Sequence, residues 1–343
     1  MGSMPHQYID RRTSKVRTEK LFADSFVNLV FSREREDAGV LFNVLSSARF
    51  SRIMAFLNYD LACMSKLAGA ESFLKGLGID LKECLDDPRS LDTPRKVFER
   101  KISYWDRRPM PPGTEAIVSP ADAKALVGSF GRESGVFIKD KFFLYRELLG
   151  FDRTAWQVAF SDGDFALFRL TPDKYHYNHV PVSGRVADIY EIPGRYLSCN
   201  PGVAVALATP YSKNKRVVTV IDTDVEGGTG AGLVAMIEVA ALMIGDIVQC
   251  YSRTRYDTPV DVRVGMFLEK GQPKSLYRPG SSTDVLIFQK GRVRFSGDLV
   301  ANMRRGDAVS RYSFGFGRPL VETDLEVRSQ IASAVFAHDK NKA

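Results

Sequence analysis

The sequence has few of the residues that build disulfide scaffolds or metal sites. Its four cysteines (Cys63, Cys84, Cys199 and Cys250) are at least 21 residues apart and form no C-x-x-C pair. This spacing excludes a disulfide-rich fold and a cysteine-type zinc site. Histidine is equally scarce, with four in 343 residues. We therefore expect a protein of a reducing compartment whose fold is held by a hydrophobic core.

The sequence also has no apolar run long enough to cross a bilayer. Its longest apolar window, residues 232–248, has 17 residues and contains Glu238 and Asp246, whereas a spanning helix needs about 20 apolar residues. The basic start of the chain is not followed by an uninterrupted apolar run, so no signal peptide is expected. These features predict a protein that is cytoplasmic or peripheral on the cytoplasmic face of a membrane.

Positive charge exceeds negative charge only mildly. The chain has 48 Lys and Arg against 41 Asp and Glu, a net charge of +7. Part of this excess lies in the first twenty residues, at Arg11, Arg12, Lys15, Arg17 and Lys20. Such an arm suits an anionic membrane surface or a nucleic acid, although most basic arms are simply solvated. Since no aromatic-rich recognition motif accompanies it, we expect no nucleic-acid partner.

The pattern of apolar residues changes near residue 92. Residues 1–92 contain apolar residues at helical spacing, which predicts amphipathic helices that pack in a core or lie on a bilayer. Residues 93–343 contain short β-rich segments bounded by Pro, Gly and Asn. These segments are 165–170, 216–221, 260–267, 284–288 and 292–295. Helices and strands do not alternate, so we predict an α+β fold, helical first and then mainly β, and no doubly wound parallel sheet.

Two of the four histidines are candidates for chemistry. His6 and His338 lie near the ends of the chain, in segments expected to be floppy. His176 and His179 are three residues apart and can serve as acid–base groups, metal ligands or ordinary loop residues. Because neither an H-E-x-x-H pattern nor a third ligand accompanies them, no metal is predicted.

Two turn segments contain further candidate groups. Gly280-Ser281-Ser282-Thr283 has the composition of an ordinary tight turn. It also fits internal serinolysis, in which a serine hydroxyl reaches the preceding carbonyl carbon in a strained turn beside a base. Asp122, at the end of Ser119-Pro120-Ala121-Asp122, can cap a helix or orient a histidine.

The order of these motifs along the chain is more specific than any one of them. The series is Asp106-Arg-Arg-Pro109, Val118-Ser-Pro-Ala-Asp122, Phe168-Arg-Leu-Thr-Pro172, Tyr175-His176-x-x-His179, Lys213-Asn-Lys-Arg216, Lys270-Gly271, and Gly280-Ser-Ser-Thr283 with Val285-Leu-Ile-Phe288. It resembles the phosphatidylserine decarboxylase family over residues 93–343.

The resemblance implies a cofactor that the protein makes from its own chain. In the family a serine attacks the carbonyl before it, the resulting ester eliminates to dehydroalanine, and hydrolysis leaves a pyruvoyl group on a new amino terminus. The pyruvoyl carbonyl then reacts with the substrate amine and accepts electrons as carbon dioxide leaves. The resemblance thus implies a pyruvoyl-dependent carboxy-lyase that uses no metal and no pyridoxal phosphate (PLP). Its substrate would be phosphatidylserine and its product phosphatidylethanolamine, at an anionic membrane surface, and a homodimer is compatible with it.

The matched motifs also imply residue roles. Asp122 matches the family's aspartate that orients the processing histidine, and His179 matches that histidine. His176 matches the histidine linked to substrate positioning and proton return. The ungapped match to the following strand favours Ser282 as the pyruvoyl precursor, and counting from Gly280 gives Ser281 as the alternative. Cleavage before Ser282 leaves a small subunit of residues 282–343.

Some positions around the implied substrate site depart from the family pattern. The family usually has an aspartate and an arginine where this chain has Lys174 and Tyr177, and one branch has a glycine in place of Ser281. Two other functions therefore stay open. One is a soluble pyruvoyl-dependent decarboxylase of a free amino acid, and the other is an unprocessed, non-catalytic member that binds lipid or a protein partner.

Overall fold

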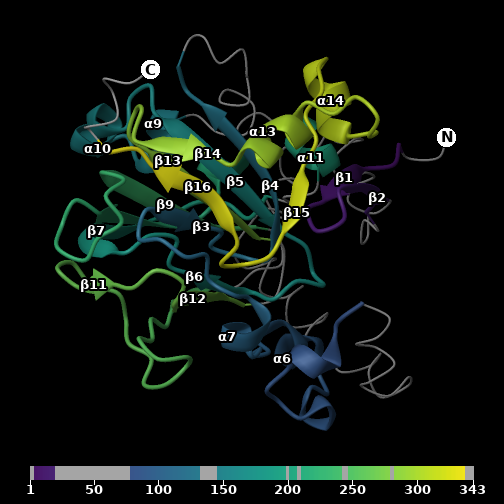
Figure 1. The fold of residues 1–343 in the computed structure, drawn as a ribbon, viewed down its shortest axis with the longest axis horizontal. Helices are drawn as coiled ribbons and strands as arrows, with labels where there is room; N and C mark the ends of the chain where they lie inside the picture. The colour runs from purple at the N-terminus through teal and green to yellow at the C-terminus, as the bar shows by residue number, and fades with distance from the viewer. Residues whose placement is uncertain are drawn as a thin grey trace.

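The computed structural model describes residues 4–19, 78–131, 145–197, 201–206, 210–241, 246–278 and 282–336. A ten-stranded sheet forms its centre (Figure 1). Its strands, in spatial order, are β11 (Phe267–Leu268), β7 (Gly184–Ile192), β8 (Arg216–Asp222), β9 (Leu233–Ala240), β13 (Ser282–Phe288), β5 (Asp164–Leu170), β4 (Ala123–Ser129), β15 (Thr323–Leu325), β1 (Gln7–Asp10) and β2 (Lys15–Thr18). Neighbouring strands are antiparallel, except that β1 and β15 are parallel.

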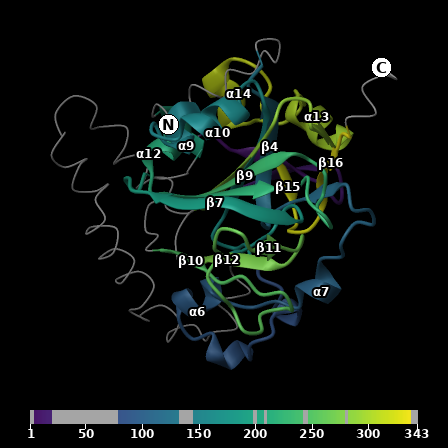
Figure 2. The same ribbon diagram turned by 90° about the vertical axis from the view of Figure 1, so that its left-hand side faces the viewer.

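Two three-stranded sheets accompany the central sheet. The first contains β10 (Ile247–Gln249), β12 (Pro273–Tyr277) and β6 (Tyr177–His179), and we call it the histidine sheet because β6 ends at His179. The second contains β14 (Val293–Phe295), β16 (Gln330–Ala334) and β3 (Ala116–Val118). Figure 2 shows the histidine sheet between the central sheet and the helices α6 and α7.

The described helices are all short. They are η2 (Leu81–Glu83), η3 (Pro88–Ser90), α6 (Pro94–Phe98), α7 (Tyr104–Arg107), α9 (Tyr145–Leu149), α10 (Thr154–Ala159), α11 (Pro201–Ala206), α12 (Pro210–Lys213), α13 (Gly297–Met303) and α14 (Arg311–Phe316). Within the described ranges, none of these helices has the length and apolar character needed to cross a membrane.

The central strands are buried on both faces. All seven residues of β13 are buried, and its side chains alternate between two core clusters. Val285 and Ile287 belong to one cluster, whereas Leu286 and Phe288 belong to the other, which also contains Tyr277 of the histidine sheet. The even-numbered residues of β13 therefore face the histidine sheet.

The described residues are mixed α and β with a dominant sheet, as an α+β fold requires. Four of the five predicted β segments coincide with β5, β8, β13 and β14. The prediction for 260–267 is wrong, because only Phe267 lies in a strand there. Its alternating valines indicated a strand, but Val264 is 60% exposed and Gly265 turns the chain at φ 86°. Exposed apolar residues gain little from strand formation.

The helical prediction for residues 1–92 is wrong for residues 7–18. Residues 7–18 form the hairpin β1–β2, and β1 pairs with β15 of the central sheet. Asp10 closes the turn by accepting hydrogen bonds from the backbone N–H groups of Arg12 and Thr13, at 3.0 and 3.2 Å. The hairpin buries Ile9 completely. The apolar stripes predicted within residues 20–77 lie outside the described residues.

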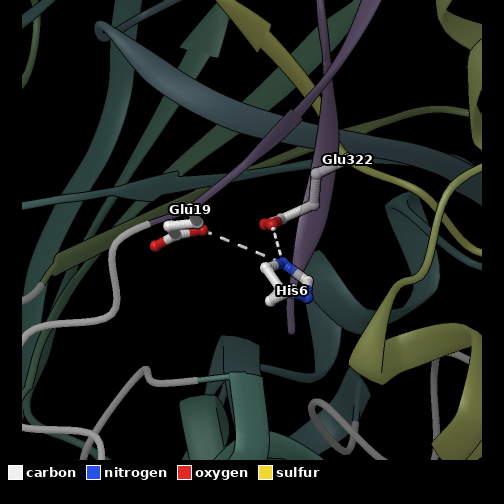
Figure 3. Close-up of side chains that lie close together, drawn as sticks. All are labelled: His6, Glu19 and Glu322. Atoms are coloured by element: carbon white, nitrogen blue, oxygen red, sulfur yellow. Dashed lines mark hydrogen bonds and ion pairs between the residues drawn. The ribbon is translucent and has the colours of Figure 1, made fainter. Parts of the chain in front are cut away.

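His6 precedes this hairpin and is fully buried, so its expected place in a floppy terminus is wrong. Its Nδ1 accepts the backbone N–H of Arg311 at 3.2 Å, so its Nε2 donates to the Glu322 carboxylate at 2.8 Å. Glu19, at the end of the hairpin, lies beside them (Figure 3). His338, for which the same expectation was made, lies outside the described residues.

His6, Glu19 and Glu322 are close enough to share a metal ion, but a cation of the chain is already bound there. Arg169 of β5 donates from Nε to Glu322 at 3.0 Å and from Nη1 to Glu19 at 2.9 Å. Its guanidinium therefore bridges both carboxylates. We call His6, Glu19, Arg169 and Glu322 the N-terminal latch, because they attach the hairpin to the central sheet.

Candidate active site

Ser282 is the first residue of β13 and lies between two strands. It pairs with Leu170 of β5 on one side and with Ala240 of β9 on the other. The residue is completely buried, and its hydroxyl oxygen has no hydrogen-bond partner among the described residues. Ser281, the alternative nucleophile, lies outside the described residues.

The side chain of Ser282 is on the face of β13 that meets the histidine sheet. Side chains two residues apart in a strand share a face, so Ser282 and Asp284 point to the same side. Asp284 accepts a hydrogen bond from the hydroxyl of Tyr277 at 2.6 Å, and Tyr277 is the last residue of β12. In the sequence, β12 is followed by Arg278, then by residues 279–281, which lie outside the described residues, and then by Ser282.

His176 is fully buried beside the end of β12. Its backbone carbonyl accepts the N–H of Tyr277 at 3.1 Å, and its ring packs against Phe98 of α6 at 4.4 Å between ring centroids. Its Nδ1 lies 2.8 Å from the carbonyl oxygen of Lys174. Because a carbonyl only accepts, Nδ1 carries the proton and Nε2 carries the lone pair. That Nε2 is buried and has no partner in the described part of the chain.

His179, at the end of β6, is held by two hydrogen bonds. Its Nδ1 donates to the carbonyl oxygen of Gly271 at 2.8 Å, which leaves Nε2 to accept from the hydroxyl of Tyr175 at 3.0 Å. The Tyr175 hydroxyl also lies 2.7 Å from that of Tyr256. His179 is therefore fixed in the tautomer that has its basic nitrogen at Nε2.

Burial keeps both histidines neutral. Desolvation is the largest cause in each case and lowers the pKa of His176 and of His179 to about 3. For His176, the positive charge of Arg100 lowers it further. Both rings are therefore uncharged at neutral pH, with the lone pair at Nε2. That of His176 has no partner in the described residues, whereas that of His179 accepts from Tyr175.

Asp122 lies near His179 but does not contact its ring. Both oxygens of its carboxylate are bound by Arg108, from Nε at 3.2 Å and from Nη2 at 3.0 Å, and the N–H of Val327 adds a third bond at 2.8 Å. Burial alone would raise the pKa of Asp122, but the charge and hydrogen bonds of Arg108 lower it. Among the described residues, no hydrogen bond joins Asp122 to His179. The two are linked through the backbone, since the His179 N–H donates to Pro120 at 2.7 Å.

A polar cavity of about 360 Å³ opens beside Asp122. Its lining includes Arg100, Arg108 and Lys174, together with Asp324. Lys174, which stands where the family usually has an acid, lies 2.7 Å from an oxygen of Asp324. An acidic group is thus present at this position, supplied by β15.

Sequence reasoning missed three groups that shape this site. Tyr175 binds His179, Arg108 binds Asp122, and Asp284 shares the face of Ser282. Arg108 was within a matched motif but had no role assigned to it. Asp284 was detectable in the sequence because its carboxyl directly precedes the apolar part of a predicted strand. A carboxyl that is buried in a strand usually requires a partner.

Comparison with known proteins identifies similar chains. The family model described as phosphatidylserine decarboxylase matches residues 95–310. The phosphatidylserine decarboxylase proenzyme of Chlamydia trachomatis serovar L2 is 30% identical over 312 residues, which cover 89% of this chain and 94% of the relative. The proenzyme of Fusobacterium nucleatum is 26% identical, over 86% of this chain and 91% of the relative. That of Vibrio cholerae is 31% identical, over 66% of this chain and 81% of the relative.

Proposed function

Because the chain belongs to the phosphatidylserine decarboxylase family, we propose that it is a self-processing precursor. It cuts its own backbone before Ser282 and then converts phosphatidylserine to phosphatidylethanolamine. The observation that carries this proposal is the Ser282 hydroxyl, which is buried and without a partner in the described residues. Leaving a buried polar group unpaired costs about 1–3 kcal/mol. A serine with only a structural role would be expected to have a partner.

Backbone cleavage at Ser282 needs a base for the serine proton. The Oγ–H bond breaks, Oγ bonds to the carbonyl carbon of residue 281, and the C–N bond to residue 282 breaks while that nitrogen takes up a proton. The ester so formed then loses the Cα proton of residue 282 as its Cβ–Oγ bond breaks, which frees residue 281 as a carboxylate and separates the two chains. A neutral imidazole accepts the first proton and returns it to the nitrogen. We assign this role to His179, whose Nε2 now accepts from Tyr175 and must exchange that partner for Ser282.

Asp122 supports His179 indirectly in this proposal. Its ion pair with Arg108 fixes the end of the segment 119–122, and Pro120 in that segment accepts the backbone N–H of His179. The carboxylate thereby stabilises the backbone position of His179, whereas the Gly271 carbonyl fixes its ring. We assign Asp122 the role of a positioning residue.

The site fits the pyruvoyl group that the family makes from its serine. Such a group supplies a carbonyl that reacts with the substrate amine and draws electrons from it as carbon dioxide leaves. β13 is paired on both sides from its first residue, so it would hold a new amino terminus at residue 282 in place after cleavage. His176 has an unpartnered Nε2 within the described structure, and we assign it the return of a proton to the substrate carbon.

The substrate is a lipid, so we further propose that the protein works at an anionic membrane surface. The amphipathic stripes within residues 20–77 and the net charge of +7 support this placement. Vesicles that contain phosphatidylserine test it. Decarboxylation of the vesicle lipid without decarboxylation of free amino acids is expected, and the opposite preference would contradict the lipid substrate.

Intact mass measurement under denaturing conditions tests the processing step. The wild-type chain is expected to give two fragments, the smaller of which starts at residue 282 and has 343 − 282 + 1 = 62 residues. Its first residue should lack an amine and should gain hydrogen when treated with sodium borohydride. The Ser282→Ala variant should remain one chain, whereas Ser281→Ala should still split.

The same measurement has two outcomes that count against these assignments. A small fragment that starts at residue 281, with splitting blocked only in Ser281→Ala, would move the nucleophile to Ser281. A wild-type chain that stays unsplit after prolonged incubation would overturn the self-processing proposal, because no carbonyl would then exist at residue 282.

The neutral histidines make stability sensitive to acid. Burial lowers both pKa values to about 3, against about 6.5 for an exposed histidine in the unfolded chain. As the pH falls below 6.5, the unfolded state binds protons first, so stability is complete above this pH and is lost below it. Between pH 7 and pH 5.5 the two histidines should together remove roughly 2–3 kcal/mol from the free energy of unfolding.

Urea denaturation of the single-chain Ser282→Ala variant at both pH values measures this loss. A further His176→Gln substitution should reduce the loss by about half, because the remaining histidine contributes alone. An equal free energy of unfolding at the two pH values would contradict the neutral state of both rings.

A further inference from the structure

A group of buried polar side chains lies between the central sheet and the histidine sheet, next to Ser282. Its acidic members are Glu238 of β9 and Asp284 of β13, which stand directly opposite each other in the strand ladder. Both are completely buried. Two facing carboxyl groups in a dry interior repel each other strongly if both are ionised, so the partners of each decide which one carries a proton.

Glu238 has the partners that an ionised carboxylate needs. Its Oε2 accepts from the ammonium of Lys274 at 2.8 Å and from the amide of Gln249 at 3.0 Å. Its Oε1 accepts from the hydroxyl of Ser275. Lys274 is itself completely buried, so its single positive charge is matched by the single negative charge of Glu238.

Among the described residues, Asp284 forms no ion pair of its own, because the nearby Lys274 is bound by Glu238. The hydroxyl of Tyr277 donates to its Oδ1 at 2.6 Å, and its Oδ2 is buried with no partner among the residues that the structure describes. Burial first, and the adjacent Glu238 carboxylate second, raise the pKa of Asp284 well above its ordinary value. An un-ionised side chain whose Oδ1 accepts from Tyr277 carries its proton on Oδ2, which has no acceptor in the described structure.

The residue that this acid can serve is Ser282. The two side chains share one face of β13, and same-face positions on a strand are about 7 Å apart. A carboxyl group spans that distance directly or through one water molecule. Ser282 is likewise buried and likewise without a partner in the described chain. Two polar groups without partners in the described chain thus lie two residues apart at the start of β13.

We propose that Asp284 is an un-ionised acid of the mature active site, which donates a hydrogen bond to the carbonyl formed at residue 282. This role rests on the self-processing proposed above. A neutral donor aimed at that oxygen would polarise the carbonyl and favour the build-up of negative charge on it, as preorganised donors do in other active sites. Tyr277 positions the acid by holding its other oxygen.

Two substitutions show whether residue 284 must supply a hydrogen-bond donor or an ionisable carboxyl group. Asp284→Asn keeps the volume, the acceptor for Tyr277 and a neutral N–H donor, so it should retain kcat within about threefold. Asp284→Leu removes the donor, and kcat should fall roughly 10- to 100-fold. Leu286→Ala is the matched control on the same face of β13, and it should lower stability without this loss of kcat.

Two measurements other than activity show whether Asp284 acts on the carbonyl at residue 282. Both Asp284 variants should still split into two chains, and the rate at which borohydride reduces the small chain should fall in Asp284→Leu but not in Asp284→Asn. Wild-type protein at pH 7 should show an infrared band of an un-ionised carboxyl group that Asp284→Asn lacks.

The infrared test also works on the unsplit Ser282→Ala chain, so it does not depend on processing. Absence of that band, or equal reduction rates in the wild type and Asp284→Leu, would overturn the role of Asp284 while leaving self-processing intact. A loss of kcat in Asp284→Asn as large as in Asp284→Leu would also overturn it, since it would mean that an ionised or proton-transferring carboxyl is needed.

Discussion

A chain with His179→Gln is expected to remain unsplit. Glutamine is similar in length but has no basic nitrogen, so it cannot accept the Ser282 proton. General bases of this kind contribute about 10²–10⁴-fold to a reaction rate, and cleavage should slow by at least 10²-fold. Gly271 fixes the proton on Nδ1 and burial keeps the ring neutral, so Nε2 carries the lone pair that takes up the proton once Ser282 replaces Tyr175 as its partner. Denaturing electrophoresis at intervals after synthesis measures the fraction of split chain.

His176→Gln is the matched control, because His176 is equally buried and equally neutral. Its chain should split at a normal rate and then fail in decarboxylation. The reverse pattern, in which His176→Gln blocks splitting and His179→Gln does not, would exchange the two roles. The structure gives a reason to test this exchange of roles. The Nε2 of His176 has no partner in the described residues, whereas that of His179 binds Tyr175.

The sequence predicts candidate reactive groups but not the contacts that set their protonation state. Ser282, His176 and His179 were singled out because the order of several motifs along the chain resembles one family, whereas each motif alone is equally typical of an ordinary turn or loop. The partners of these groups come from distant parts of the chain. Asp284 faces Glu238, 46 residues earlier, only because β13 and β9 pair in one register. Pairing over such distances depends on the whole sheet, which no local pattern specifies.

The amino-terminal hairpin shows the same limit for the fold. The basic residues of the first twenty positions indicated a solvated arm, since charge is usually exposed. Arg12, Lys15 and Arg17 are exposed, as expected. Arg11, however, forms an ion pair with Asp298 at 2.7 Å, and Glu19 pairs with Arg169 inside the core. The strand β1 exists because β15 offers it an edge, and β15 lies more than 300 residues later.

Replacing Arg169 by methionine should destabilise the protein by about 3–5 kcal/mol, the usual effect of removing one partner of a buried ion pair. Methionine fills much of the space, but Glu19 and Glu322 then remain buried with no guanidinium between them. Urea denaturation of the single-chain Ser282→Ala form measures the change. Arg11→Ala, which breaks the more exposed pair with Asp298, should cost less than about 1 kcal/mol.

A triple variant identifies the cause of the loss. Adding Glu19→Gln and Glu322→Gln to Arg169→Met removes the uncompensated charges, and much of the lost stability should return. If Arg169→Met alone costs less than 1 kcal/mol, the hairpin is held by its strand pairing and not by the latch.

Arg169 precedes Leu170, which pairs with Ser282. Loss of the latch should therefore slow cleavage as well, because the strand that flanks the nucleophile loses its anchor.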